Sequence, residues 1–220
     1  MGNLSSQVIL QVDRAVEILK AGGIVAFPTD TVYGLGGDAF NIEVAERVFR
    51  VKRRSRTLPL PVLLADFTQV TSVVDSVPGI AQFLMKHFWP GGLTLVLPKK
   101  ASFPDIITAG SNKVAVRIPD HVVPLRLIRG LDAPIIGTSA NISDKSSPMT
   151  AKEVEQQLGS QVDLIIDMGK CPGGLESTVV DVTGGTPVIL RHGVIPERDI
   201  NRACQEYARE VGKSAYCSGL

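Results

Sequence analysis

The sequence is poor in cysteine and in histidine. Its 220 residues contain three cysteines, Cys171, Cys204 and Cys217, which are widely spaced and form no CxxC pair. The three histidines fall at no spacing typical of zinc ligands, so neither a disulfide framework nor a zinc site is predicted. We expect free thiols in a reducing compartment, and hence a cytoplasmic protein.

An excess of charge of one sign is also absent. Lys and Arg together number 23 and Asp and Glu 22, which leaves a net charge of +1. Such a balance excludes binding of nucleic acid through bulk charge alone, although a local basic site remains open. Aromatic residues make up only 5% of the chain, which argues against a stacking platform for single strands.

Long apolar runs are missing as well. No run reaches the roughly 18 residues of a membrane span and no signal peptide is recognisable, so no stable membrane insertion is predicted. The first six residues, 1–6, fit the myristoylation pattern, with Gly second and Ser sixth. A single acyl chain would anchor the protein only marginally.

What the sequence does contain is an irregular alternation of helical and strand patterns. Helices are predicted near 8–19, after Asn41, after Pro78, near 122–129, after Thr150 and from about Pro196, and strands at 24–27, 60–64, 93–97, 114–118, 134–137, 164–166, 178–182 and 188–190. The glycines at 184–185 indicate a hairpin between the last two strands. We therefore predict an α/β fold with a twisted mixed β-sheet and flanking helices. One domain is expected over 1–220, with its core at about 10–200 and a C-terminal helix and short tail after 196.

Two polar clusters stand where predicted strands and helices end. The segment 28–36 carries hydroxyls, a carboxylate and a phenol into a glycine-rich turn, and 52–56 holds four cations in five residues. The first suits a small polar ligand and the second a polyphosphate. The alternatives are an ordinary turn capped by its own side chains and a solvated helix end whose cations suit the dipole.

Further polar groups follow other strands. Arg117 ends an apolar strand, where it could bind a carboxylate or form a structural salt bridge. The other candidate binding groups at strand ends are Thr138 to Asn141, Ser177 and Arg191. We find neither a nucleophile–base pair nor a metal-ligand cluster among these groups. The combination favours joining two polar ligands, at least one of them anionic, by positioning and charge neutralisation.

The same residues carry a resemblance to a known family. The chain resembles the YrdC-like family of L-threonylcarbamoyladenylate synthases in residues 23–36, Lys52-Arg53-Arg54, 89–94, Arg117-Ile118-Pro119, 138–141, Ser177-Thr178 and Arg191-His192-Gly193. The resemblance implies a twisted mixed sheet with a concave basic cavity. It also implies synthesis of threonylcarbamoyl-AMP and pyrophosphate from L-threonine, bicarbonate or CO2 and ATP with Mg²⁺, for threonylcarbamoyladenosine modification of tRNA.

Residue roles follow from the resemblance position by position. Threonine would be bound by Thr29, Tyr33, Arg117 and Ser177, and ATP by Lys52, Arg54, Arg56, Ser139, Asn141, Ser147 and Arg191. Lys52 and Arg54 would be the catalytic residues, and no metal would be held by protein side chains alone. The implied partners are tRNA-modifying threonylcarbamoyl transferase proteins, with tRNA or double-stranded RNA as a further partner.

Two departures from the family pattern matter for function. The usual Lys-Gly-Arg-Pro reads Lys52-Arg53-Arg54-Ser55, and Leu63 stands where a histidine is common, which leaves the substrate amino acid less defined. The chain resembles the short form without the C-terminal domain of longer relatives. Two other functions stay open: a non-catalytic RNA-binding module, and a paralogous enzyme that forms another carbamoyl- or acyl-adenylate.

Overall fold

The computed structural model describes residues 5–217, and the side chains of residues 5–212. Four of the six residues of the myristoylation-like pattern, residues 1–4, lie outside this part of the chain. None of the helices within it is both long enough and apolar enough to cross a membrane. The predicted mixed α/β fold is confirmed, but its strands form two sheets rather than the single sheet expected from the sequence.

The first sheet has four short strands in the order β7-β2-β1-β8. Their bounds are β1 Val25–Phe27, β2 Gly34–Gly36, β7 Thr138–Ser139 and β8 Leu164–Ile165. β1 pairs antiparallel with β2 and parallel with β8, and β2 pairs antiparallel with β7. The sequence predicted loops at β2 and β7, but both are strands. Their backbone pairing therefore fixes the polar segments around them.

The second sheet has six strands in the order β10-β9-β4-β5-β3-β6. Their bounds are β3 Val62–Leu63, β4 Leu93–Pro98, β5 Lys113–Arg117, β6 Ile135–Ile136, β9 Thr178–Asp181 and β10 Val188–Arg191. The predicted hairpin between β9 and β10 is confirmed. The two sheets meet at β6, because Ile136 N–H donates to Gly37 O at 2.8 Å and Ile135 forms a bridge with Asp38.

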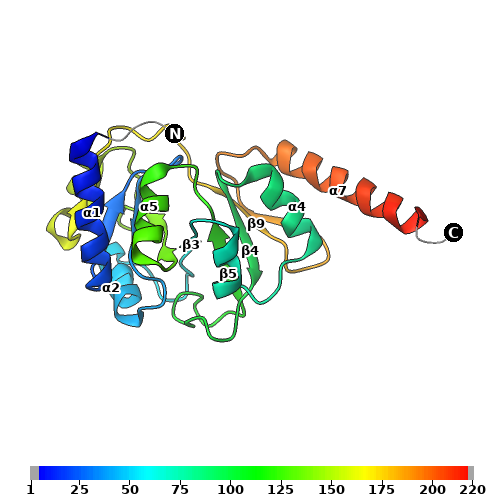
Figure 1. The fold of residues 1–220 in the computed structure, drawn as a ribbon, viewed down its shortest axis with the longest axis horizontal. Coiled ribbons are helices and arrows are strands. Elements are labelled where there is room, and N and C mark those ends of the chain that lie inside the picture. The colour runs from blue at the N-terminus through cyan, green and yellow to red at the C-terminus, as the bar shows by residue number, and fades with distance from the viewer. Residues whose placement is uncertain (1–4, 218–220) are drawn as a thin grey trace.

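Helices flank both sheets (Figure 1). They are α1 Ser6–Lys20, α2 Ile42–Lys52, α3 Val70–Val73, α4 Gly79–Phe88, α5 Val122–Leu131, α6 Ala151–Leu158 and α7 Glu197–Cys217, with short 3-10 turns at Phe67–Gln69 and Gly159–Gln161. Asn41 caps α2 as predicted, and Thr150 forms a full capping box on α6. α1 lies beside α5, and α4 packs against α7, which extends to the far end of the molecule in Figure 1.

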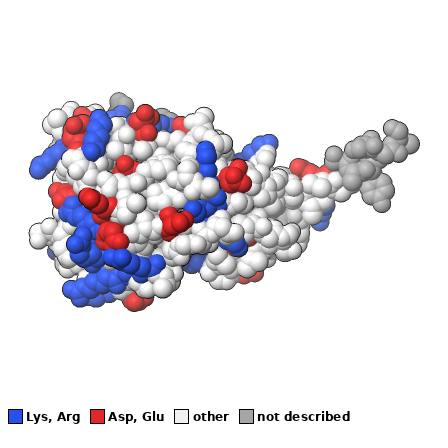
Figure 2. Space-filling model, turned by 90° about the horizontal axis from the view of Figure 1, so that it is seen from below, with Lys and Arg blue, Asp and Glu red and all other residues white. Residues whose placement is uncertain are grey.

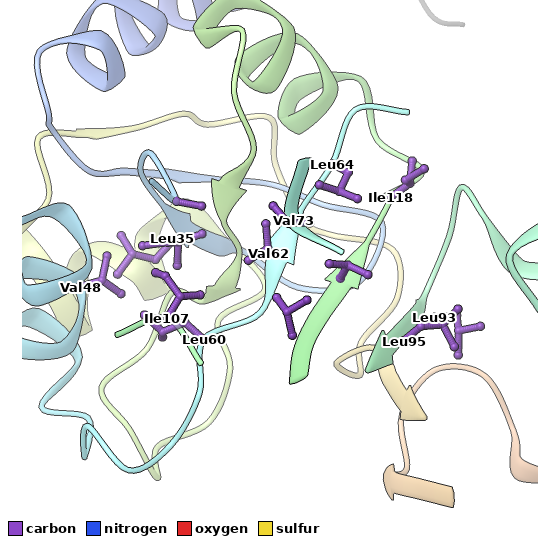
Figure 3. Close-up of a cluster of buried hydrophobic side chains, with 14 of the residues drawn as sticks. Leu35, Val48, Leu60, Val62, Leu64, Val73, Leu93, Leu95, Ile107 and Ile118 are labelled. Atoms are coloured by element: carbon purple, nitrogen blue, oxygen red, sulfur yellow. The ribbon is translucent and has the colours of Figure 1, made fainter. Parts of the chain in front are cut away.

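Two buried apolar clusters hold the layers together. The larger one joins both sheets, and Figure 3 shows Leu35 and Val48 at one end of it and Leu93 and Leu95 at the other. The smaller one lies between α1, α5 and the first sheet and includes Phe27. Because both clusters pin strands whose ends carry the polar residues, the site is built on a rigid frame.

Candidate active site

A cavity of about 240 Å³ lies where the two sheets meet. Nine predicted site residues line it: Thr29, Tyr33, Lys52, Arg54, Arg117, Ser139, Asn141, Ser177 and Arg191. The cations Lys52, Arg54, Arg117, Lys145 and Arg191 outnumber its two carboxylates, Asp144 and Glu176. The predicted basic cavity is therefore present, and it collects groups from segments more than 100 residues apart.

The turn between β1 and β2 supplies the hydroxyls at one end of the cavity. Thr29 Oγ1 donates to Val32 O at 2.7 Å and accepts from Thr31 N–H at 3.0 Å. This local bonding is the turn-capping role left open from the sequence. Because Thr29 is also buried and lines the cavity, the same hydroxyl that closes the turn faces the ligand space.

Arg117, at the end of β5, is buried beside this turn. Its Nε donates to Gly91 O at 2.8 Å, its Nη1 to Thr31 Oγ1 at 3.0 Å and its Nη2 to Asp30 Oδ1 at 2.6 Å. Burial lowers the pKa of Arg117, and the carboxylate of Asp30 opposes that shift. The structural salt bridge anticipated as one alternative is thus present, although Arg117 also lines the cavity.

Tyr33 is fully buried and lines the cavity below the turn. Its hydroxyl donates to Gly169 O at 3.0 Å, which joins the residue before β2 to the loop that precedes Glu176. Burial raises the pKa of Tyr33 to about 12, so the phenol stays protonated at neutral pH and acts as a hydrogen-bond donor.

Lys52, the last residue of α2, is 1% exposed and binds the loop after β7. Its Nζ donates to Ser139 O, to Asn141 O at 2.8 Å and to Asn141 Oδ1 at 3.0 Å. Burial lowers the pKa of Lys52 to about 7, with the charge of Arg54 adding to the shift and Glu176 opposing it. Lys52 therefore holds this loop in shape as well as lining the cavity.

The loop after β7 is further tied by its own side chains. Ser139 Oγ donates to Asn141 Oδ1 at 2.6 Å, and Asn141 Nδ2 donates to Lys145 O at 2.6 Å. The predicted ATP residues Ser139, at the end of β7, and Asn141, in the loop that follows, are thus direct neighbours. Asp144 in the same loop has φ of 67°, a left-handed conformation that bends the chain around the cavity.

Arg191 and Ser177 meet at the end of β10. Arg191 Nε donates to Ser177 O at 3.1 Å and its Nη2 to Ser177 Oγ at 3.0 Å, while its Nη1 pairs with Glu176. Ser177 Oγ also lies 2.8 Å from Thr94 Oγ1. Arg191, predicted to bind ATP, is therefore joined directly to Ser177, predicted to bind threonine.

Glu176 is a cavity residue that the sequence did not single out. Its Oε1 accepts from Ser147 Oγ at 2.6 Å, and its Oε2 pairs with Arg191. Burial opposes its ionisation, but the hydrogen bond from Ser147 and the charge of Arg191 bring its pKa below the ordinary value. Ser147 does not line the cavity itself and reaches it only through Glu176. The only sequence signal for Glu176 was its position beside Ser177.

Of the two remaining cations predicted to bind ATP, Arg54 lies in the cavity and Arg56 does not. Arg54 lines the cavity, and its guanidinium donates to Leu58 O at 3.3 Å and Pro59 O at 2.9 Å. Arg56 is exposed, pairs with Glu46 and is not among the cavity residues. Its role in binding ATP stays a prediction that this geometry does not support.

Leu63 marks the departure from the family pattern inside the cavity. It lines the cavity from β3, where it pairs with Arg117 of β5, and it packs against Gly137. A Cβ atom on Gly137 would come within 2.2 Å of Leu63 Cγ, so the glycine makes room for the leucine. The cavity wall next to Arg117 is therefore apolar.

The chemical character of the site follows from these contacts. Among the described residues, no group of three or more His, Cys, Asp and Glu side chains is placed to hold a metal ion. The cavity lining combines hydroxyls and Arg117 with the cations Lys52, Arg54 and Arg191. The fold and site thus define an α/β domain whose cavity lining is suited to a polar ligand next to an anionic one.

The chain belongs to the Sua5/YciO/YrdC family, described as "Telomere recombination", which it matches over residues 17–193. It is 43% identical over 192 residues to the threonylcarbamoyl-AMP synthase of Pyrococcus abyssi, with 87% of this chain and 56% of that protein covered. The identity to the threonylcarbamoyl-AMP synthase of Bacillus subtilis is 41% over 191 residues, covering 86% and 55%. The chain spans about half the length of these relatives.

Solved structures support the same relationship. The crystal structure of P. abyssi Sua5 complexed with L-threonine aligns with a TM-score of 0.85 at 42% identity, covering 87% of this chain and 56% of that chain. Escherichia coli YciO aligns with a TM-score of 0.77 at 29% identity, covering 86% and 92%. The family and the fold predicted from the motifs are both confirmed.

Proposed function

We propose that this chain makes L-threonylcarbamoyladenylate and pyrophosphate from L-threonine, bicarbonate or CO2 and ATP. The observation that carries the proposal is the single cavity in which a hydroxyl-rich turn and Arg117 lie beside Lys52, Arg54 and Arg191. The names of the relatives from P. abyssi and B. subtilis, and the threonine bound to P. abyssi Sua5, support the substrate class.

We assign a different group of lining residues to each substrate. We place threonine by the β1–β2 turn, with its carboxylate toward Arg117 and its side chain near Thr29, Tyr33 and Ser177. We place the phosphates of ATP by Lys52, Arg54 and Arg191, with Ser139, Asn141 and Ser147 as neutral donors. An Arg fork binds a carboxylate or phosphate in a fixed orientation, while Lys neutralises charge.

The reaction needs no covalent enzyme intermediate. The threonine amine adds to CO2 and loses a proton, which gives a carbamate. A carbamate oxygen then attacks the α-phosphorus of ATP, the bond to the β,γ-pyrophosphate breaks, and pyrophosphate leaves with the bonding electron pair. Lys52 and Arg54, the proposed catalytic residues, stabilise the charge that builds up on the phosphates, and the cavity orients the two reactants.

Mg²⁺ is implied by the family and fits the cavity when it is carried by the nucleotide. The lining holds only two carboxylates, and that of Glu176 already contacts Ser147 and Arg191, so ligands for the ion come mainly from the phosphates. When bound there, Mg²⁺ supplies Lewis-acid neutralisation of phosphate charge.

The product's threonylcarbamoyl group would pass to adenosine in tRNA through separate transferase proteins, and we propose that the chain works in the cytoplasm. Direct contact with tRNA or double-stranded RNA is a second proposal. Lys and Arg side chains gather at the end of the molecule where α1 and α2 lie (Figure 2), which would suit a phosphate backbone.

A pyrophosphate-release assay tests the proposal. The protein is mixed with ATP, Mg²⁺ and bicarbonate, with threonine present or omitted, and pyrophosphate is measured with the adenylate product identified by mass spectrometry. Release that depends on threonine and on bicarbonate is expected. Valine and serine in place of threonine then report whether the apolar wall at Leu63 relaxes selection. No dependence on any amino acid, together with RNA affinity that falls steeply with salt, would leave the RNA-binding alternative.

A further inference from the structure

Glu176 is a negative charge in the part of the cavity that the proposed function gives to phosphates. Its side chain is 29% exposed and is bound on both oxygens, by Ser147 and by Arg191. It also lies close enough to Lys52 and Ser139 for both to favour its ionised form. The carboxylate is thus surrounded by the donors proposed for ATP.

The arrangement of the donors around Glu176 indicates which kind of ligand group they could bind. Ser147 and Arg191 converge on one carboxylate from different segments, the loop before α6 and the end of β10. Arg54 also interacts with this carboxylate: burial lowers the pKa of Arg54, and the negative charge of Glu176 opposes that shift. An anion held by a hydroxyl and several cations is also the environment of a bound phosphate.

We propose that Glu176 is a specificity-determining residue, an internal counter-ion that holds Ser147 and Arg191 until the phosphates of the nucleotide take them over. This inference rests on the proposed function. A phosphate group brought next to an ionised carboxylate is repelled, so the carboxylate must give up its partners before a phosphate can contact them. Only an anion that binds Arg191 and its neighbours more strongly than Glu176 does will enter.

A merely structural role makes the opposite prediction. Glu176→Gln keeps the shape and one oxygen, which can still accept from Arg191, while its amide N–H can donate to Ser147 Oγ, but it removes the charge. If Glu176 only positions Arg191, the loss of charge loosens Arg191 and weakens anion binding. If Glu176 competes with phosphate, the same change strengthens anion binding.

The test is calorimetric titration of the full chain with pyrophosphate, without metal. We expect Glu176→Gln to bind pyrophosphate about fivefold to tenfold more tightly than the unmodified protein, an effect kept modest because both side chains of the pair are partly exposed. Asp181→Asn is the matched control, since it removes a carboxylate that pairs with Lys113 outside the cavity, and its affinity is expected to stay unchanged.

A thermal readout accompanies the titration. Without ligand, Glu176→Gln is expected to melt below the unmodified protein, because Arg191 loses its counter-ion, and pyrophosphate is expected to raise its melting temperature by more. Glu176→Ala serves as the second variant. Equal or weaker pyrophosphate binding by the folded variants would overturn the counter-ion role alone, as would failure of both variants to fold. No pyrophosphate binding by the unmodified protein would overturn the proposed function and the counter-ion role with it.

Discussion

Substitution of Arg117 can distinguish a structural role of this residue from a role in ligand binding. It is 6% exposed, and its guanidinium donates to Asp30, Thr31 and Gly91. Replacing it by methionine leaves the Asp30 carboxylate without its cation in a mostly buried position. Removing one partner of a buried ion pair costs about 3–5 kcal/mol. For a chain of this size each kcal/mol lowers Tm by about 2–4 °C, so Arg117→Met is expected to melt about 6–20 °C lower.

The double variant shows whether the pair is the cause. In Arg117→Met with Asp30→Asn neither charge remains unpaired, and an uncharged pair of similar shape costs much less than one orphaned ion. We expect the double variant to be less destabilised than the sum of the two single variants, by about 2 kcal/mol or more. The measurement is urea unfolding of all four proteins under identical conditions.

Threonine binding, measured by calorimetry, completes this prediction. If Arg117 binds the threonine carboxylate, Arg117→Met loses measurable affinity. Asp30→Asn then binds threonine at least as tightly as the unmodified protein, because a competing carboxylate is gone. Arg117→Met with an unchanged Tm would refute the structural reasoning, and unchanged threonine affinity in that variant would refute the binding role.

Three further predictions follow from other contacts. The pKa of Lys52 is about 7, so its positive charge is lost as pH rises through 7. The affinity for sulfate, measured by calorimetric titration, is therefore expected to fall between about pH 6 and 8. Lys52→Met should show no such pH dependence in the same titration. Gly36→Ala should lower the free energy of unfolding by about 3 kcal/mol or more, because a Cβ there would lie 2.1 Å from Ile136 O, and wild-type stability in urea unfolding would contradict that contact. Asn41→Ala should cost about 1 kcal/mol by removing the cap of α2 while turnover stays unchanged, and a loss of pyrophosphate release by the folded variant would contradict this.

Most helices and long strands were predictable from periodicity and end signals. The helix capped by Asn41 and the helix capped by Thr150 begin where those residues predict. The strand β2 was not predictable, because Gly34, Leu35 and Gly36 have little intrinsic preference for a strand. It exists because β1 and β7 pair with it on either side, a long-range effect that a local pattern does not contain.

The cations of the site were predictable, but their partners were not. The sequence singled out Arg117 and Arg191 as candidates for anionic ligands, and each is paired with a carboxylate, Asp30 and Glu176. Asp30 lies 87 residues from Arg117 along the chain, and only the fold brings the two together. The carboxylate of Asp30 was noted within the polar turn but not as the partner of Arg117, and Glu176 was not singled out.

Asp30 and Glu176 help to explain the near-neutral net charge of the chain. The balance of charges could have meant a basic cavity offset by an acidic exterior, yet part of the offset lies within the site itself. A pocket of unpaired cations would attract any anion, whereas cations already satisfied by Asp30 and Glu176 bind only a ligand that outcompetes a carboxylate. Strong binding at several cations at once favours a polyphosphate over a small monovalent anion. We therefore expect the selectivity of the site to depend on the acidic residues from which its cations must be released when a ligand binds.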